Sequence, residues 1–203
     1  MRVRTEARRD LIIEKATALF REMGFERATM SELAQRCGGS KATLYGYFPS
    51  KEELFVAVVK ASSTSHLSEA VTALTQRAEQ QPIKDALTQF GERMLYVLTN
   101  DEDALAVYRM VVAEAGRSVV GDLFYSAGPN ECILSLAALF AEAIANGQLR
   151  NNDPHILAKQ FLGLVTAETD VRLYQQHPAP VTLDDIRRMV ERAVDMFING
   201  AKA

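Results

Sequence analysis

Hydrophobic residues recur at helical spacing along nearly the whole chain, and no stretch alternates convincingly with the period of two that marks a strand. Proline, glycine and capping residues divide this pattern into segments. We therefore predict an all-α fold of about ten helices. The predicted helices cover residues 5–23, 29–37, 41–48, 50–76, 82–99, 101–115, 119–125, 130–146, 153–175 and 182–199.

The most informative arrangement begins at Thr29, which has capping-box spacing to Glu32 and so marks a helix start. Two glycines at 38–39 end that short helix, because glycine readily adopts the left-handed conformation found past a helix end. Ser40 then caps a second short helix over residues 41–48. Two such helices, the second carrying hydroxyls, aromatic rings and a lysine, are typical of a helix-turn-helix that enters the DNA major groove.

The motifs LFREMGFERATM, SELAQRC and KATLYGYFPSKEELF within residues 8–57 resemble the tetracycline-repressor (TetR-type) family. The later segments VYRMVVAEAGRSVVGDLFYSAGP and NGQLRNNDPHILAKQFLGLV are similar to the ligand-domain helices of an AefR-like subgroup. The resemblance implies an N-terminal three-helix DNA-binding domain, which we place at residues 1–52. It also implies a larger helical ligand-binding and dimerisation domain, which we place at residues 53–203.

Two glycines depart from the family pattern. Gly39 stands where the family usually has a branched aliphatic residue, so one small core contact is missing. Gly46 lies inside the predicted recognition helix, where glycine costs about 1 kcal/mol relative to alanine. It either lets the backbone approach DNA closely or is a tolerated glycine.

Residues on and beside the predicted recognition helix are the candidate DNA contacts. Ala42 and Thr43 can meet base edges, because their methyl groups suit the thymine methyl, and Tyr45 can reach a base or a phosphate. The remaining candidates are placed for phosphate: Thr29, Ser40, Lys41, Tyr47 and Lys51. One short helix offers few base contacts, so a two-fold dimer reading a palindromic operator is expected.

These assignments have structural alternatives. Tyr45 and Tyr47 can be packed aromatic residues, and Lys41 and Lys51 can be solvated charges. An arginine cluster near the N-terminus is either an arm that binds DNA or a disordered solubilising tail. Its members are Arg2, Arg4, Arg8 and Arg9.

Two predicted helices, within residues 132–145 and 156–167, are apolar nearly all round. A helix of this kind is buried on more than one side. We interpret one side as core and the other as the contact with a second subunit, in line with the four-helix-bundle dimer that the family resemblance implies. The alternative is a central helix in a large monomeric core.

Several side chains in the second domain can line an apolar pocket for a small hydrophobic or amphipathic effector. The candidate ligand-binding residues are Met94, Tyr108, Glu114, Phe124, Phe161 and Glu168. The two carboxylates would orient the polar end of a ligand. For each residue plain core packing is the alternative, and Glu168 has the spacing of an ordinary ion pair with Arg172.

Charge is distributed unevenly although the net charge is only −3. Residues 1–60 hold 11 Lys and Arg against 8 Asp and Glu, whereas residues 61–203 hold 12 against 18. A modestly basic head and an acidic body fit a protein whose first part meets phosphates. The sequence has neither a signal-peptide pattern nor a long apolar run, so we expect a cytoplasmic protein.

The sequence gives little support for catalysis, metal binding or reactive cysteines. No phosphate-binding loop, GxSxG or HExxH motif occurs, so no catalytic function or cofactor is expected. Asp153 and His155 alone do not make a metal site. The two cysteines, Cys37 and Cys132, lie on apolar helical faces and are interpreted as small buried residues.

The sequence thus predicts a homodimeric transcription regulator and favours a repressor released from a palindromic operator by a small hydrophobic effector. Two alternatives stay open. One is a helical binding or enzymatic module in which the helix-turn-helix is only part of the fold. The other is a regulator that activates, or that acts without a small effector.

Overall fold

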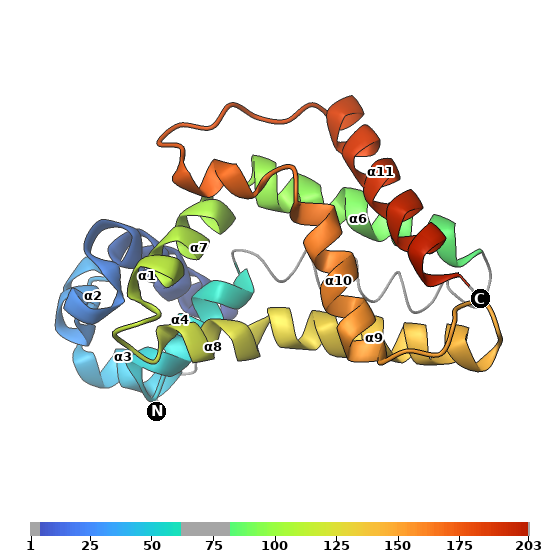
Figure 1. Ribbon diagram of the computed structural model, residues 1–203. Helices are drawn as coiled ribbons and strands as arrows, with labels where there is room; N and C mark the ends of the chain where they lie inside the picture. The colour runs from blue at the N-terminus through green and yellow to red at the C-terminus, as the bar shows by residue number, and fades with distance from the viewer. Residues whose placement is uncertain (1–4, 62–81, 203) are drawn as a thin grey trace. The chain divides into compact units, whose positions relative to one another are not determined.

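A computed structural model of the protein describes residues 5–61 and 82–202. Across these residues the chain is helical, with one short 3-10 helix and no strand, so the predicted all-α fold is confirmed (Figure 1). The elements are α1 (Glu6–Arg27), α2 (Met30–Arg36), α3 (Lys41–Tyr47), α4 (Lys51–Val59), α6 (Ile83–Asn100), α7 (Glu102–Glu114), α8 (Val120–Ala127), α9 (Pro129–Ala145), α10 (Pro154–Thr166), the 3-10 helix η2 (Asp170–Tyr174) and α11 (Leu183–Ala201).

Short polar side chains start the helices of the DNA-binding motif. The hydroxyls of Thr29, Ser40 and Ser50 each accept a hydrogen bond, 3.0 to 3.2 Å long, from the backbone amide three residues later. Each bond satisfies an N–H group that the first turn of the helix leaves free. The capping box predicted at Thr29 is only half formed, because the Glu32 carboxylate accepts a bond from Arg36 at 3.1 Å instead.

The end of α10 differs from the prediction. The helix expected to run to residue 175 ends at Thr166, because the amide and hydroxyl of Thr169 both bond to the Thr166 carbonyl, at 2.9 and 3.1 Å. A threonine that bonds to nearby backbone in this way competes with the helical pattern. The helix expected over residues 50–76 is observed as α4, and its predicted continuation from residue 62 lies outside the described residues.

The described residues divide into two compact units. The head unit comprises residues 5–61 and 103–128, and the body unit comprises residues 82–102 and 129–202. The head unit therefore contains α8 and all of α7 except its first residue, together with the DNA-binding motif. The sequence interpretation placed both helices in the ligand domain. The functional boundary after residue 52 stays a prediction.

The core of the head unit is built around three phenylalanine rings. Phe20, Phe25 and Phe55 lie with ring centroids 5.2 to 5.8 Å apart and are almost completely buried. Val111 of α7 and Val120 of α8 belong to the same cluster. Helices α1, α4, α7 and α8 thus share one core, to which α2 and α3 contribute Leu33 and Leu44.

The core of the body unit is formed by α6, α9, α10 and α11. Phe161 of α10 lies within 5.3 Å of the Phe197 ring and 6.2 Å of the Phe90 and Phe140 rings, measured between centroids. Gly91 lets α6 approach α11, because a Cβ there would lie 2.8 Å from a methyl carbon of Val190. A tightly packed aromatic core of this kind holds the four helices in fixed register.

The N-cap of α10 provides a test of the local fold. The Asp153 carboxylate accepts hydrogen bonds from the amides of His155 and Ile156 at 2.8 and 3.2 Å. Replacing Asp153 with alanine should lower the free energy of unfolding by about 1 kcal/mol. Denaturant titration measures this loss, with the exposed Asn151→Ala variant as control. Equal unfolding midpoints for the two variants would contradict the assignment.

Candidate DNA-contact surface

The turn between α2 and α3 is made by glycine. Gly38 has a φ of 60°, a left-handed conformation that residues with a Cβ rarely adopt. The amides of Gly38 and Gly39 return to the carbonyls of Gln35 and Ala34, each at 3.0 Å, and so close the end of α2. The predicted glycine stop is therefore confirmed, and it orients α3 relative to α2.

Gly39 has a second role, which the sequence did not indicate. The Arg8 guanidinium donates a hydrogen bond to the Cys37 carbonyl at 2.6 Å, and a Cβ on Gly39 would lie 2.9 Å from its Nη2 atom. Glycine at this position leaves room for a cation that caps the C-terminal end of α2. An arginine from α1 therefore packs beside the position where the family usually has a branched aliphatic side chain.

Helix α3 presents one buried and one open face. Leu44 and Phe48, the residue that ends the helix, are buried in the head core, as their spacing predicts. Lys41, Ala42 and Tyr45 are exposed, and the Tyr45 side chain retains 47% of its accessible surface. A seven-residue helix with this open face can offer methyl, phenol and ammonium groups to a DNA groove.

The remaining predicted contacts lie around this face. Thr43 is half-buried, and its hydroxyl lies 3.0 Å from that of Ser40. Thr29 is exposed at the start of α2. Tyr47 is half-buried, and its phenol oxygen accepts a hydrogen bond from the Thr5 amide at 3.1 Å. The Tyr47 hydroxyl therefore attaches the start of α1 to the end of α3.

Lys51 is turned into the protein. Its ammonium donates hydrogen bonds to the carbonyls of Phe25, Glu26 and Ala28 at 2.8, 3.3 and 3.3 Å. It also lies 4.2 Å from the centroid of the Phe25 ring, a cation–π contact. Three N–H donors thus have three protein acceptors, so Lys51 holds the end of α1 and the residue that follows it. A phosphate contact by Lys51 stays a prediction and would require one of these bonds to be exchanged.

Two of the four N-terminal arginines belong to α1 and make contacts within the head unit. Arg8 caps α2, and the Arg9 guanidinium carbon lies 5.4 Å from the centroid of the Phe48 ring. Neither is part of a disordered tail. Arg2 and Arg4 lie outside the described residues.

Three of the predicted ligand-binding residues fall in the head unit. Tyr108 of α7 and Phe124 of α8 are half-buried and stack at an angle, with ring centroids 5.6 Å apart. Glu114, the last residue of α7, accepts hydrogen bonds from the Phe25 amide, at 3.0 Å to one carboxylate oxygen and 3.1 Å to the other. Its carboxylate therefore already has a partner within the protein.

The other three fall in the body unit. Phe161 is fully buried in the aromatic core, and Met94 packs against that core. Glu168 is exposed and pairs with Arg192 of α11 through two bonds of 2.9 and 2.6 Å. This corrects the expected pair with Arg172, whose guanidinium donates to the Thr99 carbonyl at 3.0 Å. Hydrogen bonding from Arg192 holds the pKa of Glu168 below its usual value.

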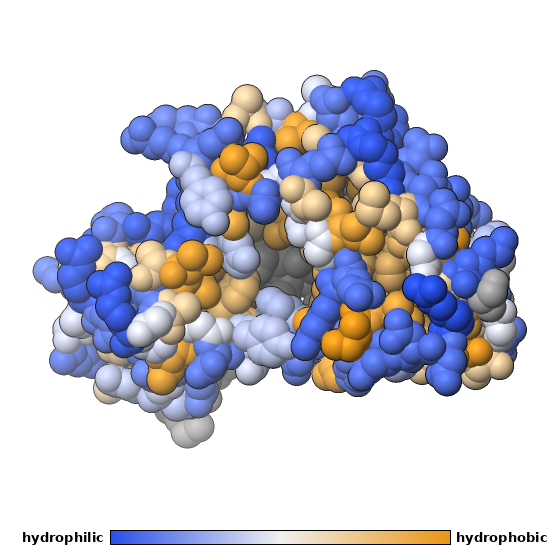
Figure 2. All heavy atoms as spheres, in the orientation of Figure 1, coloured by the Kyte–Doolittle hydropathy of each residue, from blue (hydrophilic) through white to orange (hydrophobic). Residues whose placement is uncertain are grey.

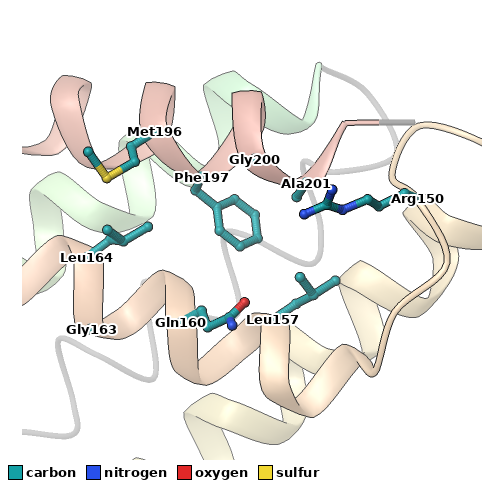
Figure 3. Close-up of a pocket in the computed structure, with 9 residues that line it drawn as sticks. All are labelled: Arg150, Leu157, Gln160, Gly163, Leu164, Met196, Phe197, Gly200 and Ala201. Carbon is teal, nitrogen blue, oxygen red and sulfur yellow. The ribbon is translucent and has the colours of Figure 1, made fainter.

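A groove of about 450 Å³ opens between α10 and α11 and contains none of the predicted ligand-binding residues (Figure 3). Leu157 and Phe197 lie in its middle, with Arg150 near one end and Met196 near the other. Its walls include Gly163 of α10 and Gly200 of α11. Figure 2 shows hydrophobic residues gathered on this part of the body unit, beside strongly hydrophilic ones. The apolar character of residues 156–167 was the only sequence signal for this surface.

The cysteines and acidic residues offer no reactive centre in the described part of the chain. Burial raises the pKa of the Cys37 thiol and raises that of Cys132 to about 11, so both thiols are poor nucleophiles at neutral pH. Residues 5–61 and 82–202 contain no group of three side chains able to hold a metal ion. None of the helices in these ranges is both long and apolar enough to cross a bilayer.

Comparison with known proteins identifies the class to which this architecture belongs. Residues 12–58 match the bacterial regulatory proteins of the tetR family, and residues 85–200 match the C-terminal domain of AefR-like transcriptional repressors. The chain belongs to the tetR family, and its C-terminal part is AefR-like. The family resemblance predicted from the motifs is confirmed. Both matched families consist of transcriptional regulators.

Individual relatives agree with this assignment. The HTH-type transcriptional regulator MT1294 of Mycobacterium tuberculosis is 30% identical over 98% of this chain and 90% of its own. The solved structure of the flavonoid-responsive regulator FrrA has a TM-score of 0.74 and 30% identity, with 98% of each chain covered. The HTH-type transcriptional activator FasR of Mycolicibacterium smegmatis is 31% identical over 60% of this chain and 61% of FasR. For FasR and other curated relatives, this chain spans less than two thirds of their length.

Replacing each of two lysines of the DNA-binding motif should change the free energy of unfolding by different amounts. Lys51→Met removes three hydrogen bonds to backbone carbonyls and should lower the free energy of unfolding by about 2 kcal/mol. Lys41→Met, at an exposed position, should leave it within about 0.5 kcal/mol of the unmodified protein. Denaturant titration of the two variants checks the contrast. Equal stability of both would show that the Lys51 ammonium does not support the end of α1.

Proposed function

We propose that this regulator is a cytoplasmic homodimeric repressor that binds a palindromic operator and leaves it when a small hydrophobic or amphipathic effector binds. The observation that carries the proposal is the open face of α3. Lys41, Ala42 and Tyr45 are exposed on this face, while the helix is fixed by the Ser40 cap, the glycine turn and the buried Leu44. Rigid presentation of a few side chains is what reading base edges requires.

Contacts to DNA divide into two kinds in this proposal. Ala42, Thr43 and Tyr45 read base edges in the major groove. Lys41, with the hydroxyls of Thr29 and Ser40, binds phosphate and sets the register of the helix. Tyr47 contributes chiefly by holding α1 to α3, and the net positive charge of residues 1–60 supports approach to DNA.

The groove between α10 and α11 supports the proposed dimer. Met196 is 65% exposed although it lines an apolar surface, and Gly163 and Gly200 would allow helices of a second copy to approach closely. Two copies related by a two-fold axis would each present α10 and α11, which gives four helices at the interface. This assignment also brings the final helix into the dimer, a point that the sequence left open.

The effector class rests on the aromatic pair in the head unit and on one relative. Tyr108 and Phe124 place two half-buried rings together on α7 and α8, the kind of surface against which a flat apolar molecule packs. FrrA, which covers nearly the whole chain, is described as flavonoid-responsive. Planar amphipathic aromatic compounds are therefore the first effectors to test.

Relatives of this chain include both repressors and an activator. The C-terminal match is to AefR-like repressors, whereas FasR is an activator. Transcription of genes beside the bound sites, measured with the regulator gene deleted, separates the two. A rise on deletion supports repression, and a fall supports activation.

The central experiment selects genomic fragments with the purified protein and titrates the best fragment at several salt concentrations. We expect a palindromic site bound at least about a thousandfold more tightly than random DNA, with a steep dependence on salt. Weak binding that ignores sequence would refute the proposal and would direct attention to ligand screening.

A pair of tyrosine variants tests whether α3 reads the operator. Tyr45→Ala should lower operator affinity by about ten- to a hundredfold, because it removes one base or phosphate contact of each protomer. Tyr174→Ala, in the body unit where 86% of the side chain is exposed, should leave affinity unchanged. Both should keep the melting temperature of the unmodified protein. A Tyr45→Ala variant that binds its operator normally would exclude this residue from the interface.

A second pair tests the proposed dimer surface. Met196→Arg places a charge in the groove between α10 and α11 and should shift the protein toward monomer, because an unpaired charge is costly to bury. Val112→Arg changes a residue of α7 in the head unit that is 58% exposed and does not line the groove, and it should leave the dimer intact. Sedimentation velocity measures both. A dimer that tolerates Met196→Arg at low protein concentration would place the interface elsewhere.

A further inference from the structure

The last part of α1, from Gly24 to Arg27, is held by its main-chain atoms rather than by its side chains alone. Gly24 interrupts the helix with φ 76° and ψ 169°, a combination essentially limited to glycine. Across the break, Arg27 donates to the Met23 carbonyl at 2.9 Å. The Lys51 ammonium from α4 binds the next exposed carbonyls, beginning with Phe25 at 2.8 Å. The side chains of Arg27 and Lys51 therefore fix the geometry of this break through hydrogen bonds to backbone carbonyls on either side of Gly24.

The backbone amide of Phe25, directly after Gly24, is held by Glu114. Both carboxylate oxygens accept from the Phe25 amide, at 3.0 and 3.1 Å, across 89 positions of sequence. A Cβ at Gly24 would lie only 2.1 Å from the nearer oxygen, so the carboxylate occupies the space that any side chain at Gly24 would need. The glycine thus serves two purposes, because it breaks the helix and it admits the carboxylate.

This contact lies directly before the helices that meet DNA. The Phe25 ring enters the head core beside Phe20 and Phe55, and Thr29, four residues later, caps α2. The position of the Phe25 backbone therefore sets where α2 begins, and α2 with its glycine turn sets where α3 lies. A charge-assisted bond to a backbone amide is among the stronger hydrogen bonds of a protein, which suits it to fixing such a point.

We infer that Glu114 is a positioning residue for DNA recognition: from the end of α7 its carboxylate fixes the Phe25 amide, and so fixes α2 and α3 for reading bases. This inference rests on the proposed DNA reading by α3, and it assigns Glu114 a role other than ligand contact. Hydrogen bonds to base edges need correct distances and angles, whereas attraction to phosphates is long-ranged. Loss of Glu114 should therefore weaken specific binding far more than non-specific binding.

Four variants of the full chain test whether the length or the charge of the side chain at position 114 matters. Glu114→Ala removes the acceptor, Glu114→Gln keeps an oxygen at the same reach, and Glu114→Asp keeps the charge on a shorter side chain. Glu26→Ala is the matched control, because it removes a carboxylate from an exposed position of the same segment. Each variant is titrated with the selected operator fragment and with a scrambled fragment of equal length. Titrations are made at one salt concentration and at a temperature where circular dichroism shows the variant folded.

The expected result is a loss of about tenfold in operator affinity for Glu114→Ala, with affinity for the scrambled fragment unchanged. Glu114→Asp should lose affinity in the same way. Glu114→Gln should return to within about threefold of the unmodified protein, and Glu26→Ala should keep the unmodified ratio of specific to scrambled binding. If Glu114→Ala does not fold, the contrast between the Gln and Asp variants carries the test.

The inference is overturned if the Ala variant, or the Asp variant when Ala does not fold, keeps the unmodified ratio. It is also overturned if Glu114→Gln loses as much specific affinity as Glu114→Asp. Failure of the proposed function looks different, because then the unmodified protein selects no site at all. A protein that selects a palindromic site and tolerates every change at Glu114 would leave the proposed function standing without this residue.

Discussion

Phe25 packs against Phe20 and Phe55 with ring centroids 5.7 and 5.2 Å apart, and the position of α2 and α3 depends on this packing. The ring can enter the core because Gly24 interrupts the helical geometry of α1 immediately before it. Burial of a phenylalanine side chain contributes roughly 2 to 3 kcal/mol, but that force has no direction. Directional bonds to the backbone on both sides of the ring supply the orientation that a DNA-reading helix requires.

Local interactions in this protein could be predicted from the sequence. Ser40 caps α3, Gly38 adopts the left-handed turn, and Leu44 is buried, because each depends on neighbours within a few positions. Such features follow from spacing and residue type alone. The exposed face of α3 was predicted for the same reason. Residue spacing was therefore enough to predict the fold class and the exposure of Lys41, Ala42 and Tyr45, whereas contact of these residues with DNA stays a prediction.

Contacts between distant segments could not be predicted. Lys51 and Glu114 are charged residues on helices, and nothing in their neighbourhoods indicates that each binds backbone atoms near Phe25. Helical periodicity says that Tyr108 and Phe161 point inward, but it does not say into which core. The structure separates them into the head and body units. The end of α10 at Thr166 was missed because Thr169 has ordinary helical neighbours in the sequence.

The head unit is built from two segments that are far apart in the sequence, so the order in which the chain is synthesised affects its folding. Domains generally fold from the N-terminus as the chain is translated. Here the DNA-binding motif emerges first, yet its core includes Val107, Val111, Val120 and Ala127. A nascent chain that has reached only α4 lacks this apolar cover. The motif completes its core only after the ribosome has added α7 and α8, which end at residue 127 of 203, so the DNA-binding motif cannot pack fully while only its own segment has been made.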